Sequence, residues 1–152
     1  MGQRHEFRGV TPYLYYDDAG AMMAWLERVF AFEQMPRHVD KSGRVREGAV
    51  KAGDAEIWVT GAPWSGYWKA HGRGELGLTL IWVADVDAHH AHVVAQGVAA
   101  DPPQDQTYGV RSYNVTDPEG YKWGFMQRLG TSYRQTKSLE EGGLKEVPPG
   151  RR

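Results

Sequence analysis

The side chains of this sequence that could act on a small molecule are mostly aromatic. The 152-residue chain contains six Trp and eight Tyr but no Cys, which excludes disulfides, thiolate metal sites and a cysteine nucleophile. Trp58 and Trp82 lie in segments with the composition of strands, where an indole could stack on a flat ring of a ligand. Both tryptophans could equally fill the interior of the domain, so a binding role and a core role remain open.

A few polar residues lie near these aromatic positions. Glu56 precedes Trp58 by two residues, on the same side of the expected strand, and is the sole candidate for acid–base catalysis. Asn114 could orient a ligand through hydrogen bonds. Arg111 could bind an anion, although an ion pair within the fold explains it slightly better.

Two further segments could carry chemistry. Residues 61–75, GAPWSGYWKAHGRGE, place Trp64 and Trp68 on a glycine-rich loop, which fits a lid over a cavity and a dimer contact equally well. The HHAH stretch contains three histidines within a helical pattern. Because no acidic or cysteine partner has suitable spacing, we expect a solvated helix surface there and no metal site.

Net charge and hydropathy restrict the partners. The formal net charge is −1, so a basic footprint for nucleic acid is absent. No apolar run reaches the length of about 20 residues that a membrane-spanning helix needs. The absence of cysteine and of an apolar leader leads us to expect a cytoplasmic protein.

The order of the elements repeats along the chain. The helix caps Asp17 and Asp85 are 68 residues apart, and the strand centres Trp58 and Gly124 are 66 apart. This predicts an α+β fold of two βαβββ repeats that form one curved mixed sheet, with a concave ligand cleft and the helices on the outer face. The expected strands are 11–16, 48–52, 55–60, 76–84, 108–116 and 121–127, and the expected helices are 19–30 and 86–96.

We expect a single domain over residues 8–129. Repeat one covers about 8–62, repeat two covers about 74–129, and a polar tail follows from 130 to 152. The last hairpin contains Asp117-Pro118-Glu119-Gly120, which has the composition of a tight turn.

Three segments resemble the vicinal oxygen chelate superfamily, which contains glyoxalases, bleomycin-resistance proteins and extradiol dioxygenases. They are PYLYYDDAGAMMAWLERVF, WVADVDAHHAHVVAQGV and YGVRSYNVTDPEGYKWGF. The pattern Tyr-Gly-x-Arg followed by Asp-Pro-x-Gly-x-x-Trp is most similar to the glyoxalase and bleomycin-resistance branch. The resemblance covers roughly residues 8 to 127.

Enzymes of that superfamily hold a divalent metal with His and Glu side chains from four strands. The resemblance places those positions at Val10, Trp58, Leu78 and Gly124, and none of these residues can bind such a cation. We therefore expect no metal and no cofactor. Gly124 then leaves space for a ligand, for Trp58 or for another side chain.

Strict alternation along the strands predicts which residues line the concave face. The other parity, with residues such as Ile57 and Trp123, should pack under the helices. The predicted lining residues are Val10, Pro12, Leu14, Glu56, Trp58, Thr60, Leu78, Leu80, Trp82, Ser112, Asn114, Lys122, Gly124 and Met126.

We expect a small-molecule-binding protein of the glyoxalase and bleomycin-resistance type that holds an aromatic or heteroaromatic ligand in a metal-free apolar cleft. Antibiotic sequestration is the model, and a homodimer is the expected assembly. The alternatives are a glyoxalase-like lyase, isomerase or dioxygenase that uses a divalent metal or Glu56, and a purely structural dimer with a filled core. The expected ligand contacts are Trp58, Trp82, Trp64, Trp68, Glu56, Leu80, Arg111, Asn114 and Gly124.

Overall fold

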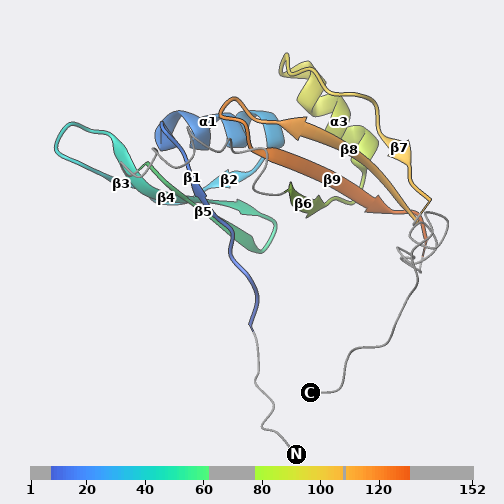
Figure 1. Cartoon of the computed structure of the whole chain (residues 1–152), viewed down its shortest axis with the longest axis horizontal. Helices are drawn as coiled ribbons and strands as arrows, with labels where there is room; N and C mark the ends of the chain where they lie inside the picture. Colours follow the sequence, from blue (N-terminus) through green and yellow to red (C-terminus); the bar gives the residue numbers. More distant parts are fainter. Residues whose placement is uncertain (1–7, 62–77, 108, 131–152) are drawn as a thin grey trace, which may run out of the picture. The chain divides into compact units, whose positions relative to one another are not determined.

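The computed structural model describes residues 8–61, 78–107 and 109–130, and the chain divides into two compact units, 1–72 and 73–152 (Figure 1). The first unit contains one helix and five short strands, and the second contains one helix and four strands, counted over the described residues. In the first unit the elements are β1 (Tyr13–Tyr15), α1 (Ala19–Phe30), β2 (Glu33–Gln34), β3 (His38–Val39), β4 (Val45–Ala52) and β5 (Ala55–Thr60). In the second they are β6 (Leu78–Trp82), α3 (Val86–Ala95), β7 (Gln104–Asp105), β8 (Val110–Thr116) and β9 (Lys122–Arg128).

The two units share one topology, which confirms the α+β class and the βαβββ repeat. The sheet order is β1-β5-β4-β2 in the first unit, with β3 also on β4, and β6-β9-β8-β7 in the second. In each unit the strand before the helix pairs in parallel with the last strand, and the last hairpin is antiparallel. The short strands β2, β3 and β7 have no recognisable sequence pattern because two residues are too few to show alternation.

The strands form two mixed sheets, where the sequence analysis expected one continuous curved sheet. Every strand ladder within the described residues joins strands of the same repeat. Hydrophobic alternation indicates which side of a strand is buried, but it carries no information about whether two edge strands pair. The concave ligand cleft remains a prediction.

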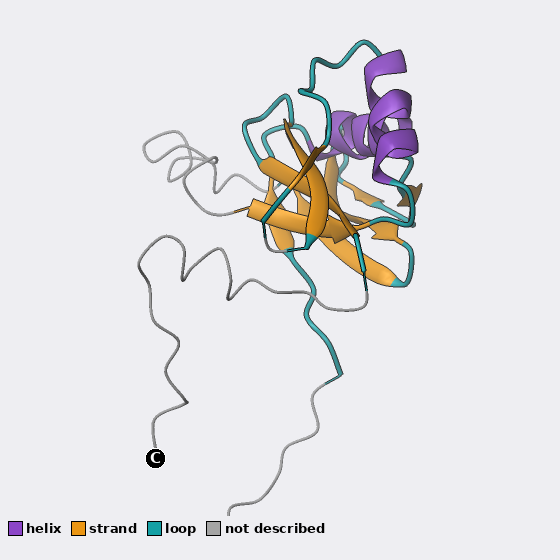
Figure 2. Ribbon diagram, turned by 90° about the vertical axis from the view of Figure 1, so that its right-hand side faces the viewer, coloured by secondary structure: helices purple, strands orange, loops and turns teal. Residues whose placement is uncertain are grey.

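Each helix packs on the sheet of its own unit, α1 mainly on β4 and α3 on β8 and β9. Figure 2 shows the helices in purple and the strands in orange. The cap of α1 is Asp18, one residue after the predicted Asp17, and its side chain accepts a hydrogen bond from the Ala21 amide at 3.0 Å. Asp85 caps α3 as predicted, through the Ala88 amide at 3.0 Å. The predicted helix at 19–30 agrees with α1 at both ends. No helix within the described residues is long and apolar enough to cross a membrane.

More side chains are buried on α1 than on α3. Met23, Leu26 and Val29 of α1 are fully buried, but only Val86 and Val93 are buried on α3. The expectation that the HHAH stretch forms a solvated surface is wrong for His89. His89 packs on Phe125 with ring centroids 4.3 Å apart, and its Nδ1 lies 2.6 Å from the Tyr113 hydroxyl.

Asp117 organises the turn between β8 and β9. Its Oδ1 accepts hydrogen bonds from the amides of Glu119 and Tyr121, both at 3.0 Å, and its Oδ2 accepts one from the indole N–H of Trp123 at 3.0 Å. The Asp117 carboxylate is buried, and so is Trp123. Gly120 has a φ of +98°, which only glycine adopts readily. The DPEGYKW motif is therefore a hydrogen-bonded unit that connects the turn to the core.

Replacing Asp117 tests this role. Asp117→Ala should lower the free energy of unfolding by about 3 kcal/mol, because two buried donors and one half-buried donor lose a charged acceptor. Asp117→Asn should cost less, since its amide oxygen can still accept from the backbone. Urea unfolding measures both, and Asp54→Ala in the exposed β4–β5 turn is the matched control with little expected change. An Asp117→Ala variant as stable as the control would contradict the role.

Candidate functional site

The exposed face of the first unit carries an aromatic corner, formed by Tyr13, Tyr15 and Trp58. Tyr13 of β1 is the direct strand partner of Trp58 of β5. The Tyr13 ring stands nearly perpendicular to both neighbours, at 84° to Tyr15 with centroids 5.3 Å apart and at 89° to Trp58 with centroids 6.2 Å apart. Trp58 is 50% exposed and Tyr13 is 44% exposed. These rings are therefore ordered by their mutual contacts and still accessible.

The other face of this sheet is covered by α1. Val59 and Ile57 are buried, and a methyl group added at Gly48 would lie 2.5 Å from the Met23 sulfur of α1. Leu14 pairs with Val59 and is buried with it. The sequence analysis placed Val10, Pro12 and Leu14 on the concave face. This prediction is wrong for Leu14, which lies on the buried face. Two tyrosines flank Leu14, so the segment lacks a clear alternation, and the pairing with β5 decides the orientation.

Two carboxylates lie on the face of the aromatic corner. The Glu56 carboxylate accepts a hydrogen bond from the indole Nε1–H of Trp58 at 2.9 Å. The Glu47 carboxylate accepts one from the Tyr13 hydroxyl at 2.7 Å and one from the Thr60 hydroxyl at 3.1 Å. Partial burial, followed by the hydrogen bond to Glu47, raises the pKa of Tyr13, so its phenol remains a donor. These bonds hold the rings and the carboxylates in one arrangement.

The sequence analysis missed Glu47. It lies just before the predicted strand at 48–52, whereas β4 begins at Val45. Glu47 has the same strand parity as Ala49, whose direct partner is Trp58. Extending the strand by three residues towards the N-terminus would have placed Glu47 beside the tryptophan face.

A cavity of about 580 Å³ opens at the Glu56 end of this face. It lies between the chain that leads into β1 and the turn before β5. The residues that line it are Arg8, Gly9, Val10, Thr11, Asp54, Ala55 and Glu56. The first unit therefore contains a space for a small molecule that adjoins a carboxylate.

The exposed face of the second unit is more apolar. Leu78, Leu80 and Trp82 of β6 are exposed by 44%, 49% and 46%. The guanidinium carbon of Arg128 lies 4.4 Å from the centroid of the Trp82 ring. Leu80 and Asn114 are the direct strand partners of Gly124 on either side. The structure thus brings together Leu80, Trp82, Asn114 and Gly124 in the second unit, as their parity predicts.

Gly124 leaves space for the side chains of its own neighbours. A methyl group at this position would lie 2.8 Å from Leu80 Cδ2 and 3.0 Å from Asn114 Oδ1. The side chains of the adjacent strands therefore occupy the space above Gly124. This agrees with the alternative that Gly124 is small in order to accommodate another side chain.

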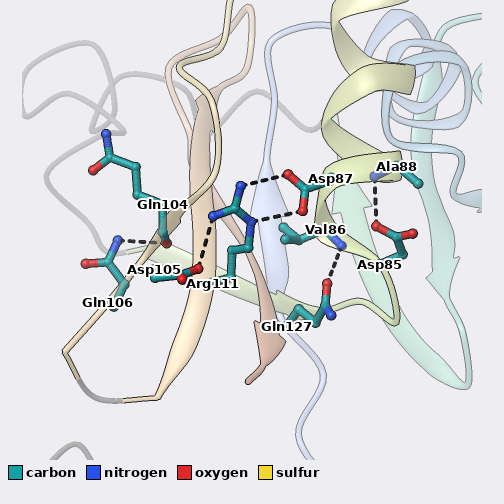
Figure 3. Close-up of polar contacts among 9 residues, drawn as sticks. All are labelled: Asp85, Val86, Asp87, Ala88, Gln104, Asp105, Gln106, Arg111 and Gln127. Atoms are coloured by element: carbon teal, nitrogen blue, oxygen red, sulfur yellow. Dashed lines mark hydrogen bonds and ion pairs between the residues drawn. The ribbon is translucent and has the colours of Figure 1, made fainter. Parts of the chain in front are cut away.

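Arg111 points to the opposite, helix-facing side of the second sheet (Figure 3). Its Nε and Nη2 each donate to the Asp87 carboxylate at 2.9 Å, and Nη1 donates to Asp105 at 3.0 Å. These bonds lower the pKa of Asp87. Arg111 connects α3 to β7, which fits the alternative of an ion pair within the fold. Trp64 and Trp68 lie outside the described residues.

The metal positions of the resembled superfamily do not fit a metal in this chain. Val10 and Leu78 have hydrocarbon side chains, Trp58 has an indole whose nitrogen donates to Glu56, and Gly124 has no side chain. Within the described ranges, no three His, Asp or Glu residues cluster as a metal site would require.

Comparisons with known proteins agree with this fold. A family model described as the Glyoxalase/Bleomycin resistance protein/Dioxygenase superfamily matches residues 9–125. The crystal structure of TioX from Micromonospora sp. ML1 is 30% identical, with a TM-score of 0.65 over 81% of this chain and 100% of that one. No curated protein sequence matches the chain.

Two more distant structures share the fold. TnmS3, an antibiotic binding protein from Streptomyces sp. CB03234, is 21% identical, with a TM-score of 0.59 over 82% of this chain and 99% of that one. The fosfomycin resistance protein FosX from Listeria monocytogenes is 16% identical, with a TM-score of 0.62 over 83% of this chain and 96% of that one.

The packing at Gly124 predicts that a small side chain is tolerated there. Gly124→Ala should change the free energy of unfolding by less than about 1 kcal/mol, because the half-exposed end of Leu80 can rotate away. Gly61→Ala is the matched comparison, because its methyl group would lie 2.5 Å from the backbone oxygen of Val45. It should cost about 2 kcal/mol or more in urea unfolding. Equal losses in the two variants would contradict this interpretation.

The Arg111 ion pairs predict a pH-dependent contribution to stability. Folding lowers the pKa of Asp87, so the pair stabilises the folded state above the ordinary carboxyl pKa of about 4, and this contribution is lost as the pH falls through the lowered value. Arg111→Ala should therefore lower the thermal midpoint at neutral pH, and its difference from the parent should shrink in acid. Lys41→Ala, on the exposed β3–β4 turn, removes the same charge and should show no such trend.

Proposed function

Because this chain belongs to the glyoxalase/bleomycin resistance protein/dioxygenase superfamily, we propose that it is a metal-free binding protein for an aromatic or heteroaromatic small molecule. The superfamily hosts several chemistries, so the fold alone does not choose among them. The choice depends on the side chains that this chain presents on its sheet faces.

The orientation of Trp58 is the observation that carries the proposal. Half of its surface is exposed, yet its indole is held by the hydrogen bond to Glu56 and by the edge contact with Tyr13. An ordered, exposed ring loses little conformational freedom when a flat ligand stacks on it. Trp82 and Leu80 supply a second exposed apolar surface in the second unit.

The polar groups support binding more than catalysis. Glu56 is the only acid–base candidate that the sequence suggested, and its carboxylate is engaged by the Trp58 indole. The four metal positions carry no ligand side chains. We propose sequestration of an antibiotic as the biological role, in line with the description of TnmS3 as an antibiotic binding protein. The proposal includes a cytoplasmic homodimer.

Removing the Trp58 ring tests the proposal. N-phenyl-1-naphthylamine, a neutral diarylamine whose fluorescence rises in apolar sites, is the probe. Trp58→Ala should weaken its binding about ten-fold, which corresponds to about 1.4 kcal/mol. Trp25→Phe is the matched control, because Trp25 lies on α1 against Phe30 and phenylalanine keeps a ring there. Unchanged probe affinity in Trp58→Ala would exclude Trp58 from the site.

Native mass spectrometry of the purified protein tests the metal-free state and the assembly together. We expect dimers without a bound divalent ion, some of them with a carried small molecule. One divalent ion per chain that disappears in Glu56→Ala would contradict the metal-free proposal and favour the enzyme alternative.

A further inference from the structure

The aromatic corner has the geometry of a cation-binding surface. A cation is attracted to the face of an aromatic ring because the ring quadrupole is negative there. Tyr13 stands nearly perpendicular to both Tyr15 and Trp58, so the three neighbouring rings do not share one plane and their faces point in different directions. Because Tyr13 and Trp58 are about half exposed, these faces are accessible to a ligand.

Glu47 adds a negative charge beside these rings. The carboxylate contacts within the described residues are the hydroxyls of Tyr13 and Thr60, which are neutral donors. Such donors hold the carboxylate in place without cancelling its charge. The nearest ionisable strand partner of Glu47 is His38 of β3, which is exposed. Arg111 provides a contrast, because two aspartates compensate its charge.

The other end of the corner is also acidic. Glu56 and Asp54 both line the cavity of about 580 Å³. The basic groups near Glu56 are Lys51, its strand partner, and Arg8 in the cavity wall. The Glu47 end therefore carries the less compensated negative charge, and it lies directly beside Tyr13.

We propose that the aromatic corner binds a positively charged alkylated ammonium group of the ligand, with Glu47 as its anionic partner. This inference rests on the proposed function and names a chemical feature of the ligand. A quaternary or tertiary ammonium fits the corner best, because such a group is weakly hydrated and has alkyl surfaces that contact ring faces. Glu47 then determines specificity, whereas Trp58 supplies affinity for any flat ring.

Two probes of equal shape separate the charge from the hydrophobic contact. Benzyltrimethylammonium and neopentylbenzene differ only in the nitrogen that replaces a carbon. Their binding is followed through the indole N–H resonance of Trp58, assigned with Trp58→Phe. The cation should bind roughly five-fold more tightly than the neutral probe, and about 0.5 M salt should weaken binding of the cation alone.

Glu47→Gln is the decisive variant. The glutamine oxygen can still accept from the Tyr13 hydroxyl, and its NH2 group can donate to the Thr60 hydroxyl oxygen, whose proton can bond the Arg46 carbonyl, so the corner should remain in place while its charge is lost. The variant should remove most of the preference for the cation and leave binding of neopentylbenzene unchanged. Glu27→Gln, on α1, is the matched control and should retain the preference.

The outcomes distinguish this inference from the function on which it rests. Equal binding of both probes to the parent protein, or a preference that survives Glu47→Gln, overturns the cation site and leaves aromatic binding intact. If neither these probes nor N-phenyl-1-naphthylamine shifts the Trp58 resonance, both proposals fail.

Discussion

The register of the strand pairs is the constraint on which the rest of the structure depends. Successive side chains alternate between the two faces of a sheet, so a shift of one residue would exchange the buried and exposed sets. In the second unit, the buried Asp117 carboxylate fixes the turn that sets the pairing of β8 with β9. In the first unit, the parallel pairing of Tyr13 with Trp58 has the same consequence. These pairings therefore determine which side chains lie on the buried face of each sheet and which lie on the exposed face.

The helix-facing side of the second sheet and the exposed side of the first sheet differ in how their charged side chains are compensated. On the helix-facing side of the second unit, Arg111 forms ion pairs with Asp87 and Asp105, so its charge serves to connect α3, β7 and β8. On the exposed side of the first unit, hydroxyl and indole donors hold Glu47 and Glu56. An ion-pair partner compensates the charge of a side chain, whereas a neutral hydrogen-bond donor leaves that charge available to a ligand. The exposed face is therefore the one suited to recognition.

The chain keeps the fold of the superfamily, and the four positions that the resemblance equates with metal ligands carry Val10, Trp58, Leu78 and Gly124. At Gly124, the side chains of Leu80 and Asn114 extend over the place where a larger side chain would be. At Trp58, an indole takes the equivalent position and is held by its own carboxylate neighbour. Substitutions on the exposed face leave the buried residues of the opposite parity untouched, which is why one fold can serve different chemistries.

The sequence alone determined the repeat and the limits of both helices to within one residue. Asp18 and Asp85 cap the helices through contacts with residues three positions along the chain, and such local interactions are readable from sequence. The repeat and the clear alternation of 55–60 also placed Trp58, Glu56 and Gly124 on their faces. Only the tertiary structure decided the face on which Leu14 lies, the ion pairs of Arg111, the packing of His89 and the position of Glu47 beside Tyr13. Each of these depends on pairing or packing between residues distant in sequence, and periodicity within one segment carries no information about such partners.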